Sequence, residues 1–84
     1  MRLSGIAPEE VRRDTPRIIL TGREEVLVEQ HGGLFSYESR CIRLRTRMGL
    51  LTVTGEGLVI SHFGAHDALI RGRVDGLRVD GDMP

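Results

Sequence analysis

The chain has 84 residues, with twelve basic and twelve acidic side chains and therefore no formal net charge. A chain of this length forms one small domain with a narrow stability margin. Its balanced charge provides no overall field that would attract nucleic acid or an anionic membrane. Cys41 is the only cysteine, which excludes an internal disulfide and a multi-thiolate metal site. Because no apolar run reaches the ~18–20 residues that cross a bilayer and no signal peptide pattern is present, we expect a reduced, cytoplasmic protein.

The first part of the chain differs from the rest. Pro8 to Arg13 could form one helical turn, which Pro16 ends because the residue before a proline is pushed toward extended geometry. We therefore predict a partly ordered N-terminal arm over residues 1–16, a single β domain over residues 17–80 and a frayed tail over residues 81–84.

From Arg17 onward the pattern is that of an all-β protein. Short segments alternate between apolar and polar residues, and glycine-containing turns separate them. The expected strands are 18–21, 26–28, 34–37, 41–48, 51–54, 58–60, 68–74 and 77–79. Links this short make neighbouring strands antiparallel. We predict about eight short strands in a meander that forms a small barrel or rolled sheet, with a β-solenoid of stacked rungs as the alternative.

The stretch from Leu50 to His62 has the pattern of a β-hairpin with a turn at Gly55-Glu56-Gly57. The segment from Ile18 to Glu29 repeats this pattern, with one more residue in its turn. Side chains in a strand change face at every residue, so the second hairpin places four apolar residues on one buried face. These residues are Leu51, Val53, Leu58 and Ile60.

Several strands carry apolar residues on both faces. Ile19, Leu27 and Val59 lie opposite the residues expected in the core. A sheet that is wet on one side does not need apolar residues there. Either the sheet folds over on itself or this second face meets another subunit, so we predict Ile19, Leu27 and Val59 as a self-association face.

Arg43, Arg45 and Arg47 form an arginine stripe on the outward face of the predicted strand 41–48, while Ile42, Leu44 and Met48 face inward. Side chains on one strand face stand about 7 Å apart, close to a phosphate spacing. The stripe is a candidate partner-binding face for an acidic protein or a phospholipid. Nucleic acid is the least favoured partner, because interleaved aromatic residues are absent. The simpler alternative is a solvated face whose arginines meet Glu24, Glu38 or Glu56.

Histidine and cysteine residues offer weaker candidate sites. His62, His66 and Asp67 could contribute to a metal site with His31, but the segment reads as a strand end and a loop, where the His-x3-His spacing does not set the rings together. Cys41 stands near arginines but lacks a positioned base, so burial is the more common fate for such a thiol. We expect no metal, no cofactor and no catalytic residue.

The order and spacing of the segments resemble the YabP/YqfC family of sporulation proteins, and more closely its YqfC branch. The matching segments are Asp14–Ile18, Thr21-Gly22, Val28–Leu34, Tyr37, Ile42–Leu44, Gly49–Gly55, Leu58–Ile60 and Ile70–Val74. This resemblance implies expression in endospore-forming bacteria, a role in building the spore and no known catalytic activity. It also implies a membrane protein partner of the YqfD type, and therefore a cytoplasmic protein of the mother cell that is peripheral to the forespore outer membrane.

The sequence thus predicts a non-enzymatic structural or assembly factor of spore formation, which self-associates or docks on a membrane protein. We expect neither nucleic acid nor a small-molecule substrate. The alternative is a ligand- or nucleic-acid-binding β module that uses the arginine stripe.

Overall fold

The computed structural model describes residues 15–81, which form one antiparallel sheet of six strands with no helix. The strands are β1 (Arg17–Thr21), β2 (Glu25–Glu29), β3 (His31–Glu38), β4 (Cys41–Thr46), β5 (Gly49–Phe63) and β6 (Asp67–Asp80). Their order across the sheet is β1-β2-β6-β5-β4-β3. The prediction of an all-β, antiparallel fold is confirmed. Of the predicted N-terminal arm and C-terminal tail, residues 1–14 and 82–84 lie outside the described residues.

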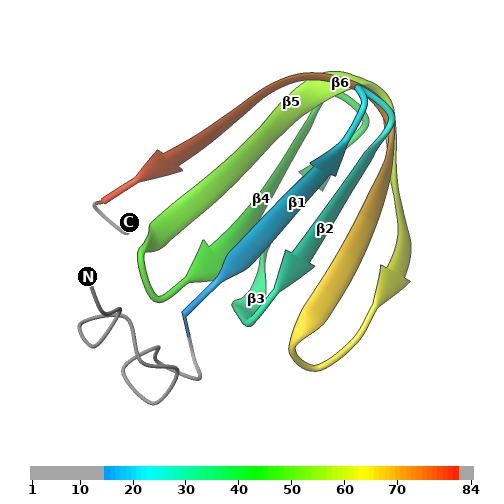
Figure 1. The fold of residues 1–84 in the computed structure, drawn as a ribbon. Helices are drawn as coiled ribbons and strands as arrows, with labels where there is room; N and C mark the ends of the chain where they lie inside the picture. Colours follow the sequence, from blue (N-terminus) through cyan, green and yellow to red (C-terminus); the bar gives the residue numbers. More distant parts are fainter. Residues whose placement is uncertain (1–14, 82–84) are drawn as a thin grey trace, which may run out of the picture.

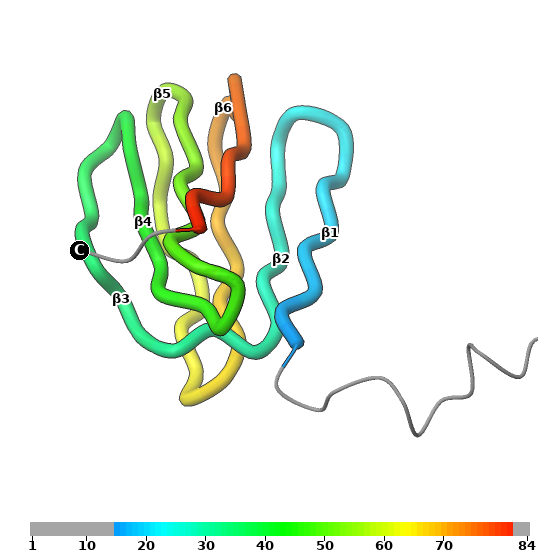
Figure 2. Tube along the Cα trace, turned by 90° about the vertical axis from the view of Figure 1, so that its left-hand side faces the viewer, coloured from blue at the N-terminus to red at the C-terminus, as the bar shows by residue number. Residues whose placement is uncertain are grey.

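The sheet is folded across its two long strands, β5 and β6, which curve over together (Figure 1). The start of β6 pairs with β2, whereas the start of β5 pairs with β4. One layer therefore contains β1, β2, the start of β6 and the end of β5, and the second layer contains the end of β6, the start of β5, β4 and β3. The result is a rolled sheet and not a closed barrel, because β1 and β3 remain at its two opposite ends (Figure 2).

The core lies between the two layers and is made of aliphatic side chains from both. The first layer contributes Val26, Val28, Leu58, Ala68 and Ile70, with Ile18 and Ile60 packed against them. The second layer contributes Ile42, Leu44, Leu51, Val53 and Val74. Burial of one such aliphatic side chain is worth about 1.5–3 kcal/mol. We call the surface that lines this core the inner face of each layer, and the opposite surface its outer face.

The predicted turn at Gly55-Glu56-Gly57 is wrong, because β5 runs through these residues as one strand. The inward residues change from odd positions, Leu51 and Val53, to even positions, Leu58 and Ile60. Because side chains alternate along a strand, this change of position needs one extra residue in β5. The register of β5 with β6 shifts accordingly, between Glu56 and Val59. A hairpin turn and a bulge both satisfy this pattern, which explains why the four residues share the core as predicted while the connection differs.

Backbone contacts with neighbouring turns hold the bend of the long strands. The N–H groups of Gly55 and Leu58 donate to the carbonyls of Arg40 and Ser39 in the β3–β4 turn, at 3.1 and 2.8 Å. On β6, the N–H of Val74 donates to the carbonyl of Arg23 in the β1–β2 turn at 2.7 Å. Both ends of the folded sheet thereby support the place where the ribbon bends.

The predicted strands 68–74 and 77–79 also merge into one strand, β6, so that eight predicted strands become six. Here too the register shifts, between Thr54 and Gly55 on β5. By contrast, the segment from Ile18 to Glu29 does form the predicted hairpin, β1–β2, in which the N–H of Glu24 donates to the carbonyl of Thr21 at 3.2 Å. Similar sequence patterns therefore form a hairpin in one place and a bent strand in the other.

The predicted strand 41–48 ends two residues early, at Thr46. The hydroxyl of Thr46 donates to the carbonyl of Gly49 at 2.7 Å and accepts a hydrogen bond from the N–H of Met48 at 3.1 Å. These bonds close a turn at Arg47 and Met48. Met48, which we predicted to face inward, is 48% exposed.

No helix among residues 15–81 is long and apolar enough to cross a membrane.

We predict that Val53→Asp unfolds the domain, because the side chain of Val53 is fully buried and an unpaired charge there costs several kcal/mol. Val59→Asp is the matched control on the same strand, since Val59 is 51% exposed. It should change the free energy of unfolding by no more than about 0.5 kcal/mol. Circular dichroism and urea unfolding measure both effects, and cooperative folding of Val53→Asp would contradict the assigned core.

Gly55→Ala should lower the free energy of unfolding by about 1–3 kcal/mol, because overpacking of this size strains a core. A Cβ atom at residue 55 would collide with the backbone carbonyl of Arg73 on β6. At Gly81 a Cβ atom would have nothing within 4 Å, so Gly81→Ala is the control. Equal urea midpoints for the two variants would show that the close approach of β5 and β6 at the bend does not matter.

Candidate interaction surface

The outer face of the first layer carries a row of three aliphatic side chains. Ile19 on β1 is directly opposite Leu27 on β2, and Leu27 is opposite Leu69 on β6. All three are half-buried. We call Ile19, Leu27 and Leu69 the apolar row. The sequence pattern indicated Ile19 and Leu27 but not Leu69, because only the pairing of β2 with β6, which are far apart in sequence, brings Leu69 beside Leu27.

Val59, the third predicted member of this face, lies on the same side of the sheet but not in the row. Its partner across β6 is Arg71, which is two residues beyond Leu69 on the same side of that strand. Of the predicted self-association face, Ile19 and Leu27 therefore lie in the apolar row, whereas Val59 is a separate exposed apolar side chain.

Ion pairs flank the apolar row on both sides. On one side Arg17 meets Glu29 at 3.5 Å, and on the other Arg71 meets Glu25 at 3.4 Å. Exposed pairs of this kind contribute at most about 1 kcal/mol each. An apolar strip with a polar rim is the arrangement typical of a protein interaction surface.

The predicted arginine stripe is only partly formed. Arg43 and Arg45 lie on the outer face of β4, but Arg47 lies in the following turn and not on the strand. The guanidinium of Arg45 stacks over the ring of Phe35 on β3, 5.0 Å from its centroid. Within residues 15–81, neither Arg43 nor Arg45 forms an ion pair with a carboxylate, and Glu56, one of the expected partners, meets Arg73 instead.

Two buried polar atoms lie side by side on this outer face without a hydrogen-bond partner among the described residues. They are Nε of Arg43 and Oγ1 of Thr52, and the two residues are directly paired across β4 and β5. Thr52 is also paired with Arg78 on β6, so the threonine lies between two arginines. Arg78 in turn meets Asp80 at 3.2 Å. The outer face of the second layer is thus richer in positive charge than that of the first.

His31 forms a buried corner where the chain passes from β2 to β3, although the sequence suggested only a turn there. Its Nε2 lies 3.0 and 3.1 Å from the carbonyl oxygens of Gly64 and Asp67, and its Nδ1 accepts from the N–H of Gly33 at 3.0 Å. The ring also stacks on Phe63, with centroids 4.8 Å apart. Nε2 therefore carries the proton, and all ring nitrogens of the neutral tautomer are satisfied.

The corner also contains Gln30, the one non-glycine among residues 15–81 with a positive φ, 66°. This backbone geometry costs about 1–2 kcal/mol. The cost is offset locally, because the N–H groups of Gln30 and His31 both donate to the carbonyl of His66. The histidine and its backbone partners thus fix the direction in which β3 leaves the first layer.

The residues considered for metal binding or catalysis do not converge. His62 lies 3.5 Å from Asp67, but His66 is exposed and the ring of His31 is hydrogen-bonded to backbone groups. No three His, Cys, Asp or Glu side chains of the described chain are grouped so that they could hold a metal ion. Cys41 is half-buried at the start of β4, directly opposite Thr54 on β5.

An open groove of about 810 Å³ lies beside the start of β1. Its lining includes Arg17, Glu29 and Asp67 together with Pro16 and His66. Two of its carboxylates already have partners, because Glu29 meets Arg17 and Asp67 meets His62. Both carboxylates of the lining therefore belong to ion pairs of the sheet surface.

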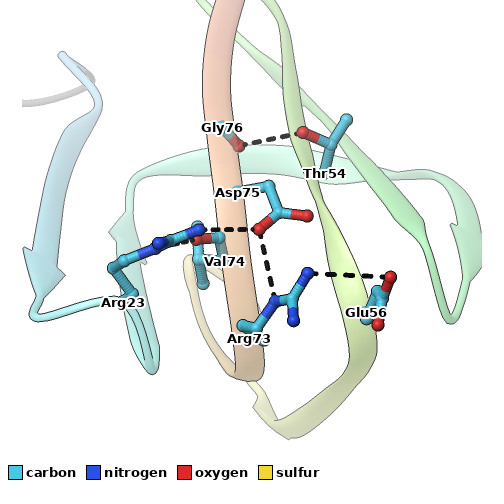
Figure 3. Close-up of polar contacts among 7 residues, drawn as sticks. All are labelled: Arg23, Thr54, Glu56, Arg73, Val74, Asp75 and Gly76. Carbon is cyan, nitrogen blue, oxygen red and sulfur yellow. Dashed lines mark hydrogen bonds and ion pairs between the residues drawn. The ribbon is translucent and has the colours of Figure 1, made fainter.

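A network of exposed charges supports the bend of the sheet (Figure 3). Oδ1 of Asp75 accepts from Arg23 at 2.9 Å and lies 3.4 Å from Nε of Arg73, which also meets Glu56 at 3.7 Å. The network joins the β1–β2 turn, β6 and the bend of β5. Its residues come from distant parts of the sequence, so no local sequence pattern predicted the network.

Comparison with known proteins places this fold in a family. Residues 13–82 match the YabP family. The chain is also 31% identical over 71 residues to YqfC of Bacillus subtilis (strain 168), itself an uncharacterized protein, over 84% of this chain and 76% of that protein. The chain belongs to the YabP family. The resemblance inferred from the sequence is thereby confirmed, and with it the association of this YabP-family domain with sporulation.

His31→Ala should lower the free energy of unfolding by about 2 kcal/mol or more, because each buried polar group left unpaired costs about 1–3 kcal/mol. His66→Ala is the matched control, since that side chain is exposed and makes no contact that holds the corner. It should change stability by no more than about 0.5 kcal/mol. Urea unfolding compares the two, and a His31→Ala midpoint equal to that of wild type would refute the structural role of the corner.

Proposed function

We propose that this YabP-family protein is a non-enzymatic structural or assembly factor of spore formation. It acts through contact with other proteins, either by self-association or by docking on a membrane protein. The apolar row of Ile19, Leu27 and Leu69 is the observation that carries this proposal. Family membership supplies the link to sporulation.

The physical argument concerns a small domain with apolar side chains on both sides of one layer. The inner face of β2 already has Val26 and Val28 in the core, so Leu27 is not needed to fill it. A partner that covers the apolar row would remove that surface from water and would stabilise a domain with a narrow margin. The flanking ion pairs provide the polar rim that such contacts usually have.

The assignment as a non-enzyme has its own support. Two of the polar groups that could carry chemistry help to build the sheet: His31 binds backbone groups at the corner, and Asp75 binds two arginines at the bend. The resemblance to the YqfC branch further supports a location in the mother cell cytoplasm, at the periphery of the forespore outer membrane, with a membrane partner of the YqfD type. The proposed function requires no cofactor, nucleic acid or small-molecule substrate.

Deletion of the gene in the endospore-forming host should lower the number of heat-resistant spores without slowing vegetative growth. The wild-type gene should restore sporulation, whereas a Leu27→Ser/Leu69→Ser gene should not, because it makes the apolar row polar while it leaves the core intact. Protein levels and urea unfolding verify that the variant is folded. Normal spore numbers after deletion would refute the role in spore formation.

An Arg43→Gln/Arg45→Gln gene is the matched comparison for the alternative function. These two arginines form the remaining candidate face for an acidic ligand or nucleic acid, and they have no carboxylate partner within residues 15–81. We expect this variant to restore sporulation as well as wild type. Failure of the arginine variant together with success of the Leu27→Ser/Leu69→Ser variant would move the interaction surface to the second layer.

A further inference from the structure

β1 is an end strand of the sheet with one unpaired side. Among residues 15–81 it pairs with β2 alone, and Figure 2 shows it at the opposite end of the folded sheet from β3. The backbone N–H and C=O groups that point away from β2 therefore have no ladder partner in this part of the chain. Such an edge is a template for another strand unless the protein blocks it with a bulge, a proline or charged side chains.

The other edges of the described sheet carry such blocks along their length, including the end of β5, which lies beyond its pairing with β4 and has two register shifts with β6. On β1 the one charged residue is Arg17, at the first position of the strand. β3 has two register shifts along its pairing with β4, one of them within its glycine-containing start. The end of β6 carries the charged residues Asp75, Arg78 and Asp80. The register of β1 with β2 is regular throughout, and its middle is an uninterrupted aliphatic run, Ile18-Ile19-Leu20.

The side chains of β1 show an incomplete inner face at this edge. Ile18 and Leu20 are opposite Val28 and Val26 of the core, so both point inward. Ile18 is half-buried against the core, but Leu20 remains 47% exposed. An apolar residue on the inner side of an end strand lacks the neighbour that a further strand would supply.

We propose that β1 pairs with β1 of a second copy of this chain, antiparallel and centred on Ile19. A two-fold axis through Ile19 places each Ile19 opposite its equivalent, Ile18 opposite Leu20, and Arg17 opposite Thr21. Two-fold interfaces of this kind use the same patch on both copies. The pairing makes one sheet that continues through both molecules.

This register satisfies both faces of the edge. On the inner side, the exposed Leu20 of each copy gains Ile18 of the other as its cross-strand neighbour. On the outer side, the two Ile19 residues join the apolar rows of the two copies into one row of six side chains. No like charges face each other across the two strands, because Arg17 of each copy lies opposite Thr21 of the other copy. Each Arg17 also retains its ion pair with Glu29 of its own chain.

Neighbouring symmetric registers fit less well. A centre at Ile18 places Pro16, which has no N–H group, opposite Leu20. A centre at Leu20 places Gly22, which follows the strand and has a φ of 57°, opposite Ile18. Only the centre at Ile19 uses all five residues of β1. This pairing deepens the proposed function, and it rests on that function only for the idea that the protein takes part in an assembly. It names a second copy of the chain as the first contact of that assembly.

A cysteine at the axis tests the pairing. In the full chain with Cys41→Ser, Ile19→Cys should form an intermolecular disulfide dimer under mild oxidation, because the two residues become direct cross-strand neighbours. Val59→Cys and Leu34→Cys in the same background are the controls; both side chains are exposed, but neither lies on β1. Mass spectrometry and non-reducing gels measure the dimer fraction. Cross-linking of Ile19→Cys no faster than that of the controls would overturn the proposal.

Sedimentation equilibrium of the unmodified chain provides the second measurement. The average mass should rise with concentration toward that of two copies, and Leu20→Lys should raise the dissociation constant about tenfold or more, since 1.4 kcal/mol corresponds to one factor of ten. Leu20 is exposed in the single chain, so the variant remains folded. A Leu20→Lys protein that dimerises like wild type would place the contact elsewhere and overturn the proposal.

The two proposals fail in different ways. A spore defect on deletion, combined with no preferential cross-linking at residue 19, overturns the β1 pairing and leaves the sporulation role standing. Preferential cross-linking combined with normal spores after deletion does the reverse. Capture of Ile19→Cys by a membrane protein in place of a second copy would also overturn the pairing, because it would assign the β1 edge to that partner.

Discussion

The close backbone contact between β5 and β6 at their shared bend is the constraint on which the rest of the structure depends. Gly55 lies against the carbonyl of Arg73 so closely that no side chain fits between them. Gly57, with a φ of 63°, provides the extra residue of the bulge. Together they let one ribbon serve two layers, and a sheet that folds in this way encloses a core without closing into a barrel.

The outer strands adapt to that ribbon. The carbonyls of the β1–β2 and β3–β4 turns accept hydrogen bonds from N–H groups of the bend, and the His31 corner carries β3 from the first layer to the far end of the second. These contacts join segments that are distant in the sequence. Their hydrogen bonds are shielded from water at the corner and more exposed at the bend. The ion pairs around Asp75 at the bend contribute little energy individually, but they define the arrangement of the turns.

A folded sheet differs from a barrel in one functional respect, because it keeps free edges. In this protein the edge of β1, which has no ladder partner within residues 15–81, adjoins the apolar row on the outer face of the same layer. Both features involve Ile19, so the proposed self-association edge and the proposed docking surface meet at one strand. A partner bound at either surface would add stability to a small domain with little core.

Two-residue alternation determined much of this protein from its sequence alone: the all-β class, the inward positions of Val53 and Ile60, and the β1–β2 hairpin. The order of its segments also indicated the family. Tertiary structure decided whether Gly55-Glu56-Gly57 is a turn or a bulge, because both give the same alternation and only the pairing partner differs. Alternation also did not predict the local turn that Thr46 closes with Gly49, which moves Arg47 off the strand. Tertiary contacts placed Leu69 beside Leu27 and buried His31. These two outcomes depend on contacts between residues far apart in the chain, which local periodicity does not encode.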